Sequence, residues 1–424
     1  MRKAFCVAVA LGATILFGAS QAAAVSSETD MLLQLLQKKG VITQADVKQF
    51  KAVIDQKMAE EAEIDPEHHH TVQGVAKRLD KLERAVTEVR SGKEPAGKVQ
   101  LSGVMEVNAT AGRVRYKDSV TPDENSSDII LNTAELDADA AINDHVSAHL
   151  ALLYEEDSTN NDGSGIVVDE GIINLDGGAQ LPLYLWAGKM YLPFGYYASH
   201  FITDPLTLTL GRIRDTAVIA GYHDSVFDFN AGVFKGEVRK TGSSSRFDSF
   251  VGSAAWTMPK GAIKGLALTT GLSYTSNLAT SDTLQGRLAT ANEVTDMVGG
   301  YSVFLHMKYM DYSFDAEYLA AASGFANGDM NFIAADNNTP AAWNFELAAE
   351  LMPKLEAALR YGGSSETGGY RHKDPATSMA QSQVGGLLAY DILDDTTVTF
   401  EYLHDEYKNE IADDLATLQL AVEF

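Results

Sequence analysis

The last nine residues of the chain show most clearly what it can fold into. Every second residue there is apolar: Ala416, Leu418, Leu420, Val422 and Phe424. The polar residues Thr417, Gln419 and Glu423 lie between them. Successive side chains of a β-strand point to opposite faces, so this period of two predicts a strand with one apolar face. Single strands of this kind are common in ordinary sheets, and the rest of the chain decides what this one belongs to.

The same alternation recurs along residues 98–424, mostly in runs of about 9 to 11 residues, the length that a tilted strand needs to cross a bilayer. Long connections are expected near residues 117–127, 155–165, 192–212, 236–247, 276–296, 323–340, 363–380 and 405–413. Short turns alternate with them, at residues 143–144, 176–180, 223–224, 259–265, 310–311, 353–354 and 391–395. Eight long and seven short connections predict sixteen strands with both chain ends on the short-turn side, which is the plan of a bacterial outer-membrane barrel.

Strands with a lipid-facing side must close into a barrel, because every backbone amide in hydrocarbon needs a hydrogen-bonding partner. Six tyrosines fall toward strand ends, where aromatic girdles belong: Tyr154, Tyr274, Tyr309, Tyr361, Tyr390 and Tyr402. The terminal strand also resembles the closing strand of such barrels, which ends on Phe. The predicted fold class is therefore an all-β transmembrane barrel of about sixteen antiparallel strands over residues 98–424, preceded by a short periplasmic α-helical or coiled-coil segment.

Residues 1–24 have the organisation of a secretory signal peptide. Arg2 and Lys3 precede an apolar run, and small residues suit cleavage after Ala22 or Ala24. The apolar run is too short for a spanning helix. The only cysteine, Cys6, lies in this leader, so the fold of the mature chain cannot depend on disulfides.

Residues 25–97 are expected to form a periplasmic helical segment of short helices and linkers. The consecutive residues His68, His69 and His70 indicate a solvated linker rather than a metal site, because adjacent residues of a regular element do not all face one ion. Within a helix over 74–90, an a/d heptad seam is formed by Val75, Leu79, Leu82, Val86 and Val89. This helix either joins copies of the chain into a homo-oligomer or packs on the first helices, and two heptads do not decide between these roles.

The net charge of −25 is concentrated in the predicted barrel, since residues 98–424 hold 20 basic and 45 acidic side chains. This balance argues against nucleic acid as a partner. Eleven charged residues on the polar faces of the strands are expected to line the pore: Glu135, Asp137, Asp139, Asp228, Lys308, Asp315, Glu317, Glu346, Glu350, Arg360 and Glu401. Glu356 belongs to the same acidic set. A lumen of this sign favours cations over anions, although each carboxylate taken alone can simply be solvated.

The connection after the fifth strand is long and unusually apolar. Long loops of this kind are usually functional, so this one either folds into the barrel mouth as a constriction or packs outside without a special role. The residues that would form the constriction are Tyr191, Pro193, Phe194, Gly195, His200, Asp204, Arg212 and Arg214.

No motif indicates an enzyme, a metal site or a cofactor. His145, His149, His200, His306 and His404 have no motif-like neighbours for a Ser/His/Asp or His/Ser/Asn set. A glycine-rich phosphate loop is missing as well.

Two stretches carry a family resemblance: Gly-Lys-Met-Tyr-Leu-Pro-Phe-Gly at 188–195, and the run from Ser199-His200 to Thr203-Asp204-Pro205-Leu206-Thr207. With the Lys-Lys-Gly-Val-Ile-Thr run at 38–43, the chain resembles the LbtU-type siderophore porins. The resemblance implies an outer-membrane transporter that admits iron-siderophore complexes without a plug domain. The alternatives are a general diffusion porin with weak cation preference, and a structural tether that acts through its periplasmic helix.

Overall fold

The computed structural model describes residues 99–116, 121–156, 165–178, 181–244, 247–331, 338–365, 379–407 and 411–424. The predicted leader, the helical segment at 25–97 and its heptad helix lie outside the described residues and stay predictions.

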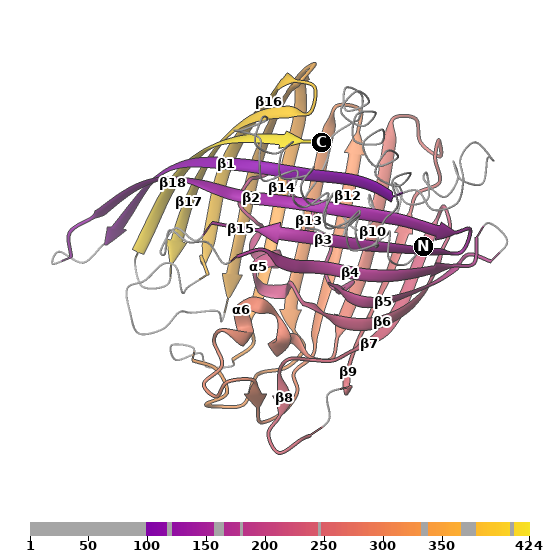
Figure 1. The fold of residues 1–424 in the computed structure, drawn as a ribbon. Helices are drawn as coiled ribbons and strands as arrows, with labels where there is room; N and C mark the ends of the chain where they lie inside the picture. The colour runs from indigo at the N-terminus through magenta and orange to yellow at the C-terminus, as the bar shows by residue number, and fades with distance from the viewer. Residues whose placement is uncertain are drawn as a thin grey trace, which may run out of the picture. The chain divides into compact units, whose positions relative to one another are not determined.

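Sixteen antiparallel strands close into a barrel, which confirms the predicted fold class (Figure 1). The first eight are β1 (Val99–Tyr116), β2 (Glu124–Asn143), β3 (Val146–Tyr154), β4 (Val167–Asp176), β5 (Leu183–Tyr191), β6 (Arg214–His223), β7 (Phe227–Phe234) and β9 (Ser249–Thr257). The other eight are β10 (Leu266–Thr275), β12 (Gly300–Tyr309), β13 (Tyr312–Ala321), β14 (Ala341–Met352), β15 (Leu355–Ser365), β16 (Ser382–Leu393), β17 (Thr396–Tyr407) and β18 (Ile411–Glu423). Each strand pairs with its neighbours in the barrel, and β1 pairs with β18 to close the ring.

Long and short connections alternate as predicted, but strands reach into two of the predicted long ones. β2 begins at Glu124, within 117–127, and β17 and β18 cover residues 405–407 and 411–413 of 405–413. The β1–β2 hairpin stays paired up to Val114 and Glu124, and β17 and β18 stay paired up to Tyr407 and Ile411. An ion pair of 2.8 Å between Arg113 and Asp123 supports the β1–β2 hairpin. On the outer face of β1, Arg113 and Arg115 take the alternate positions in this extension, so the apolar alternation that marks a membrane strand ends before it.

The inner and outer faces of the barrel differ as the alternation requires. On β17, Phe400 and Tyr402 are 47% and 44% exposed, whereas Glu401 between them is completely buried. Inside the ring, Tyr184 lies flat over Gly221, where an added Cβ would come within 2.1 Å of the tyrosine ring. Glycine at this position therefore lets an aromatic side chain pack directly on the barrel wall.

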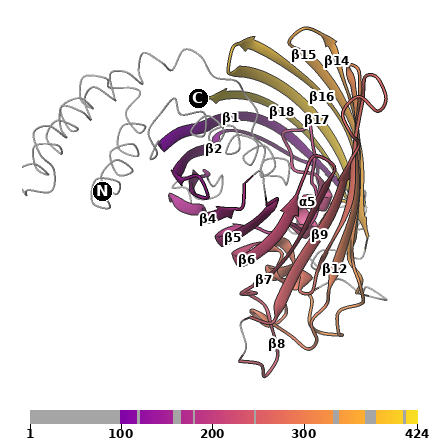
Figure 2. The ribbon, with the colours of Figure 1, turned by 90° about the vertical axis from the view of Figure 1, so that its right-hand side faces the viewer.

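Part of the interior is filled by the chain's own connections. Residues 192–213 contain the short helix α5 (Leu206–Gly211), which lies inside the ring of strands against β13, β14 and β15 (Figure 2). The connection after β10 contains η1 (Leu278–Thr280) and α6 (Asp282–Gln285), and the two-residue strands β8 (Arg239–Lys240) and β11 (Glu293–Val294) pair with each other. These connections share one apolar cluster with the inner faces of the strands, which includes Phe194, Leu208, Leu278, Val294, Leu319 and Phe325. In the described part of the chain, none of the helices has the length and apolar character needed to cross a bilayer.

Candidate functional site: a barrel interior with an inserted segment

The inserted segment, defined here as residues 192–205, turns into the barrel directly after β5. Phe194 is 1% exposed and belongs to the apolar cluster. Gly195 follows with φ of 85°, and a Cβ there would lie 2.1 Å from the ring of Tyr197. Only glycine fits this left-handed conformation and this contact together, so the Pro193-Phe194-Gly195 sequence sets the sharp exit from the strand.

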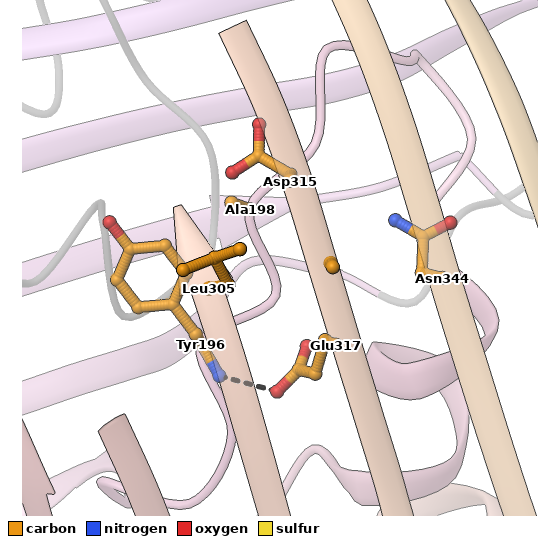
Figure 3. Close-up of a pocket in the computed structure, with 7 residues that line it drawn as sticks. Tyr196, Ala198, Leu305, Asp315, Glu317 and Asn344 are labelled. Carbon is orange, nitrogen blue, oxygen red and sulfur yellow. Dashed lines mark hydrogen bonds between the residues drawn. The ribbon is translucent and has the colours of Figure 1, made fainter. Parts of the chain in front are cut away.

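Glu317 on β13 holds the beginning of the inserted segment. Its carboxylate accepts the backbone N–H of Tyr196 at 2.7 Å (Figure 3). It also accepts the backbone N–H of Tyr197 (2.9 Å) and the hydroxyl groups of Thr207 (3.0 Å) and Ser302 (2.7 Å). Four donors satisfy a buried carboxylate, which would otherwise be costly to keep away from water. The ring of Tyr196 stacks on Phe304 of β12, with centroids 4.2 Å apart.

Glu346 and Arg360 hold the middle of the segment. The Glu346 carboxylate on β14 accepts the backbone N–H of His200 (2.8 Å) and pairs with Nε of Arg360 (2.9 Å). Arg360 on β15 also donates to the carbonyl oxygen of Thr203 (2.8 Å) and to Oγ of Ser199 (2.5 Å). The Arg360 and Glu346 side chains are both 0% exposed. This buried pair is therefore stabilised by a full set of hydrogen bonds from the segment.

Glu401 on β17 holds the far end of the segment. Thr203 donates to it through both its backbone N–H (3.0 Å) and its hydroxyl (2.6 Å). The segment is thus attached to β13, β14, β15 and β17, four strands along one side of the ring. Attachment at this many points fixes the segment within the lumen.

The side chain of His200 also reaches the wall, where it contacts two strands. Its Nδ1 lies 2.8 Å from Oε1 of Glu356 on β15, and its Nε2 lies 2.9 Å from Oγ of Ser313 and 3.5 Å from Oδ2 of Asp315 on β13. Burial alone would lower the pKa of His200, but the hydrogen bonds to Asp315 and Glu356 and the nearby charge of Glu346 outweigh it and raise the pKa to about 10.

The hydrogen bonds of His200 have the arrangement of a catalytic triad, in which a nucleophile, a base and an orienting carboxylate follow one another. Ser313 has the place of the nucleophile, His200 that of the base and Glu356 that of the carboxylate. A base must be neutral to accept the proton of the serine hydroxyl. His200 is protonated at neutral pH because its pKa is raised to about 10, so its Nε2–H donates to Ser313. The arrangement is therefore an ion-paired attachment of the segment rather than a hydrolytic triad.

A second charged cluster lies at the long-connection ends of β4, β5 and β6. Arg214 pairs with Asp169, and Arg212 binds Asp282 at 3.0 Å. The two guanidinium groups lie 5.8 and 6.0 Å from the centre of the Tyr191 ring. Tyr191 and Arg214 face each other across the β5–β6 pair, so they belong to the strands rather than to the inserted segment, in contrast to the predicted set. Asp204 does lie in the segment, with a side chain 55% exposed.

The predicted pore-lining residues fall into two groups, those covered by the inserted segment and those elsewhere on the inner face. Burial contradicts the expected pore-lining position for the first group, and for Glu135 and Asp137 of the second. Glu317, Glu346, Arg360 and Glu401 are on the inner face but are buried under the inserted segment. Their hydrogen-bonding capacity is used by the segment, which removes their charges from the open lumen. Asp315 is likewise buried, with His306 at 2.6 Å.

The second group lies elsewhere on the same face. Glu135 and Asp137 on β2 are buried, and Asp139 next to them accepts a hydrogen bond from His149 at 2.7 Å. Asp228 pairs with His223. Near the short turns, Lys308 and Glu350 are exposed, and Glu350 pairs across the strands with Glu356. The acidic groups that meet the lumen are thus fewer than the sequence indicates.

Several functional contacts had no signal in the sequence. Ser199, Ser302, Thr203, Thr207 and Ser313 all donate to or accept from the network that holds the segment. Their partners lie far away in the chain, and small hydroxyl residues are common in loops and strands. The histidines do follow a rule that could have been noticed, because His149, His200, His223, His306 and His404 each have a carboxylate as partner.

The fold of the barrel resembles that of outer-membrane porins. The fold matches the outer membrane channel DcaP of Acinetobacter baumannii with a TM-score of 0.52 and 15% identity, over 78% of this chain and 98% of that one. It matches Pseudomonas putida OprB with a TM-score of 0.50 and 10% identity, over 77% and 94% of the two chains. An anion-selective porin from Comamonas acidovorans matches with a TM-score of 0.50 and 11% identity, over 77% and 100%. At these identities the likeness establishes the fold alone.

No family model matches the chain. Among curated proteins it is similar to a UPF0422 protein of Legionella pneumophila (strain Lens), 26% identical over 324 residues, which are 72% of this chain and 59% of the relative. A UPF0422 protein of Coxiella burnetii (strain RSA 493) is 27% identical over 317 residues, 73% of this chain and 64% of the relative. The chain therefore spans about three fifths of the length of these relatives. Their name states no solute, so the predicted likeness to LbtU-type siderophore porins stays a prediction.

Proposed function

We propose that the protein is a passive outer-membrane channel whose aperture is set by the inserted segment at residues 192–205. The observation that carries this proposal is the attachment of the segment to wall carboxylates on three strands, Glu317, Glu346 and Glu401. A segment held in this way narrows a closed barrel, and in this proposal solutes pass beside it. The periplasmic helices, with a homo-oligomer formed through residues 74–90, belong to the same proposal.

The channel prefers cations in this proposal, because the lumen-facing groups outside the attachment network remain mostly acidic. Glu350 is exposed beside the short turn after β14, and Asp139 and Asp228 are partly exposed on the inner face. Purified protein in planar bilayers under a salt gradient tests this. A cation-selective reversal potential is expected, which moves toward zero in Glu350→Gln. An anion preference would contradict the charge argument, and a barrel that never conducts would leave the tether as the function.

Iron-siderophore complexes are the solute that we propose for this channel. The residues that carry the resemblance to siderophore porins, at 188–195 and 199–207, lie at the end of β5, in the inserted segment and in the first two residues of α5. The motif therefore coincides with the part of the barrel that meets a passing solute. Cells that lack the gene are expected to take up less iron from a ferric siderophore, and the intact gene is expected to restore uptake. Unchanged uptake together with normal conductance would favour the general diffusion porin.

A further inference from the structure

The positively charged imidazolium of His200 lies close to three carboxylates, so its single charge cannot neutralise all of them. Glu356 and Asp315 contact its two ring nitrogens, and the carboxylate of Glu346 accepts its backbone N–H. Arg360 balances Glu346 on the buried side, at 2.9 Å. His306 shares Asp315, whose two oxygens are thereby divided between two histidines. Among the residues that the structure describes, His200 is the cation paired with Glu356, at 2.8 Å.

This network meets the lumen at its edge. The side chains of His200, His306 and Glu356 are 22%, 24% and 39% exposed, while Asp315 beneath them is 5% exposed. Glu350 stands directly across from Glu356 on the neighbouring strand, so two carboxylates face each other beside the histidine. Like charges in such a cross-strand pair repel, and a cation next to one of them relieves the repulsion.

We infer that His200 is a specificity-determining residue of the channel, whose fixed positive charge neutralises the Glu356 and Glu350 pair and so limits the preference of the pore for cations. The inference rests on the proposed channel function and deepens it. In lumens of this kind, the sign of the exposed charges decides which ions enter. Removing one positive charge from the edge of the inserted segment leaves two facing carboxylates uncompensated there.

The titration of His200 supports this reading. Its pKa is raised to about 10, so the positive charge is present throughout the neutral range and is lost only in alkaline solution. The charged groups packed around it are Glu356 and Arg360 on β15, Asp315 on β13, Glu346 on β14 and His306 on β12. Lys308 is a further positive charge that is exposed on β12, so a variant that lacks only His200 is the necessary reference.

The test measures reversal potentials of the full-length protein in planar bilayers, under a potassium chloride gradient, from pH 6 to pH 10.5. In the native channel, cation selectivity is expected to be constant between pH 6 and 8 and to rise between pH 8 and 10.5. His200→Gln keeps a hydrogen-bonding side chain without the charge, and it is expected to show high selectivity already at pH 6 and a smaller rise above pH 8. His200→Lys restores a positive charge and should return the native selectivity at pH 6.

Glu356→Gln serves as a second, independent variant. Without this carboxylate the pKa of His200 falls, so the alkaline rise in selectivity is expected at lower pH. If His200→Gln has the native selectivity at every pH, the charge of His200 does not control permeation and the inference is wrong. If His200→Gln and His200→Lys change selectivity equally, the residue acts through the position of the segment alone, which also overturns it. A protein without any conductance would instead contradict the proposed channel function.

Discussion

Arg360 shows how much of the segment's position depends on one side chain. Its guanidinium group binds Glu346, the carbonyl of Thr203 and the hydroxyl of Ser199, and it lies 4.3 Å from the ring centre of Phe201. A planar fork of donors is needed to serve three acceptors at once, and lysine does not provide one. Breaking a buried pair by removing one partner leaves an uncompensated charge, which costs about 3–5 kcal/mol.

We therefore expect Arg360→Met to lower the free energy of unfolding by about 3–5 kcal/mol and to increase the noise of single-channel currents, because the segment loses its hold on β15. Urea unfolding in detergent and planar-bilayer recordings measure the two effects. Arg360→Lys is the matched variant, which keeps the charge but loses the fork. The double variant Arg360→Met with Glu346→Met should recover part of the lost stability, and no recovery would show that the pair is not coupled.

His200 adds a pH dependence to stability. Its pKa is about 10 in the folded protein and near 6.5 in an unfolded chain, so the folded state holds the proton more tightly. The stabilisation is complete below about pH 6.5 and is lost as the pH rises through about 10. The urea midpoints of the native protein and of His200→Gln are thus expected to converge between pH 6.5 and 10. If the difference between the two urea midpoints increased with pH, it would contradict a raised pKa of His200 in the folded protein.

The sequence predicted which charged residues point inward but not what they bind. Alternation identifies Glu317 and Glu401 as inner-face residues, because it is a local property of each strand. Their partners Tyr196 and Thr203 are 121 and 198 residues away. Contacts at such separations follow from the closure of the ring, which no local pattern records.

The inserted segment acts as an element of its own. It is attached at Glu317, at Glu346 with Arg360, and at Glu401, and α5 continues from it along the wall. The helix was not expected, because Leu206, Leu208 and Leu210 alternate with Thr207 and Thr209 as they would in a strand. All three leucines are nevertheless buried, since the apolar cluster surrounds the short helix on several sides. Tertiary packing overrides local pattern here.

Replacing residues 196–204 by a short Gly-Ser linker, with α5 and Phe194 retained, is expected to raise the single-channel conductance. The space in front of β13 to β17 becomes open, and Glu317, Glu346 and Glu401 gain access to water. Cation selectivity should rise with the conductance for this reason. A linker of equal composition in place of residues 239–244, in the connection after β7, serves as the control and should leave both quantities unchanged. An unchanged conductance in the first variant would show that the segment does not narrow the path.

The molecule as a whole is held together by the closure of its ring. β18 pairs with β1 from Val104 and Glu423 to Tyr116 and Ile411, and with β17 on its other side. The closure of the ring could be predicted from the sequence, since the number and order of connections require an even number of strands. The length of the β1–β2 hairpin could not be predicted, because its polar residue pairs lack the apolar alternation of a lipid-facing strand.

Deleting residues 416–424 is expected to abolish assembly into membranes. The deletion leaves β1 and β17 with unpaired edges, and each unpaired backbone group in lipid costs several kcal/mol. Heat-dependent mobility on gels reports whether a folded barrel forms. Thr417→Ser, an inner-face change in the same strand, should assemble normally. A folded barrel from the truncated chain would show that another strand can close the ring.

The wall recognises the inserted segment largely through its main chain, at the amides of Tyr196, Tyr197, His200 and Thr203. Every amino acid except proline supplies such an amide, so these main-chain hydrogen bonds do not depend on the side chain. Substitutions at Asp204, whose side chain is 55% exposed, can thus alter the chemistry of the passage while these main-chain hydrogen bonds remain. Related proteins can therefore come to admit a different solute through a few side-chain substitutions, while the main chain of the segment stays in the same place.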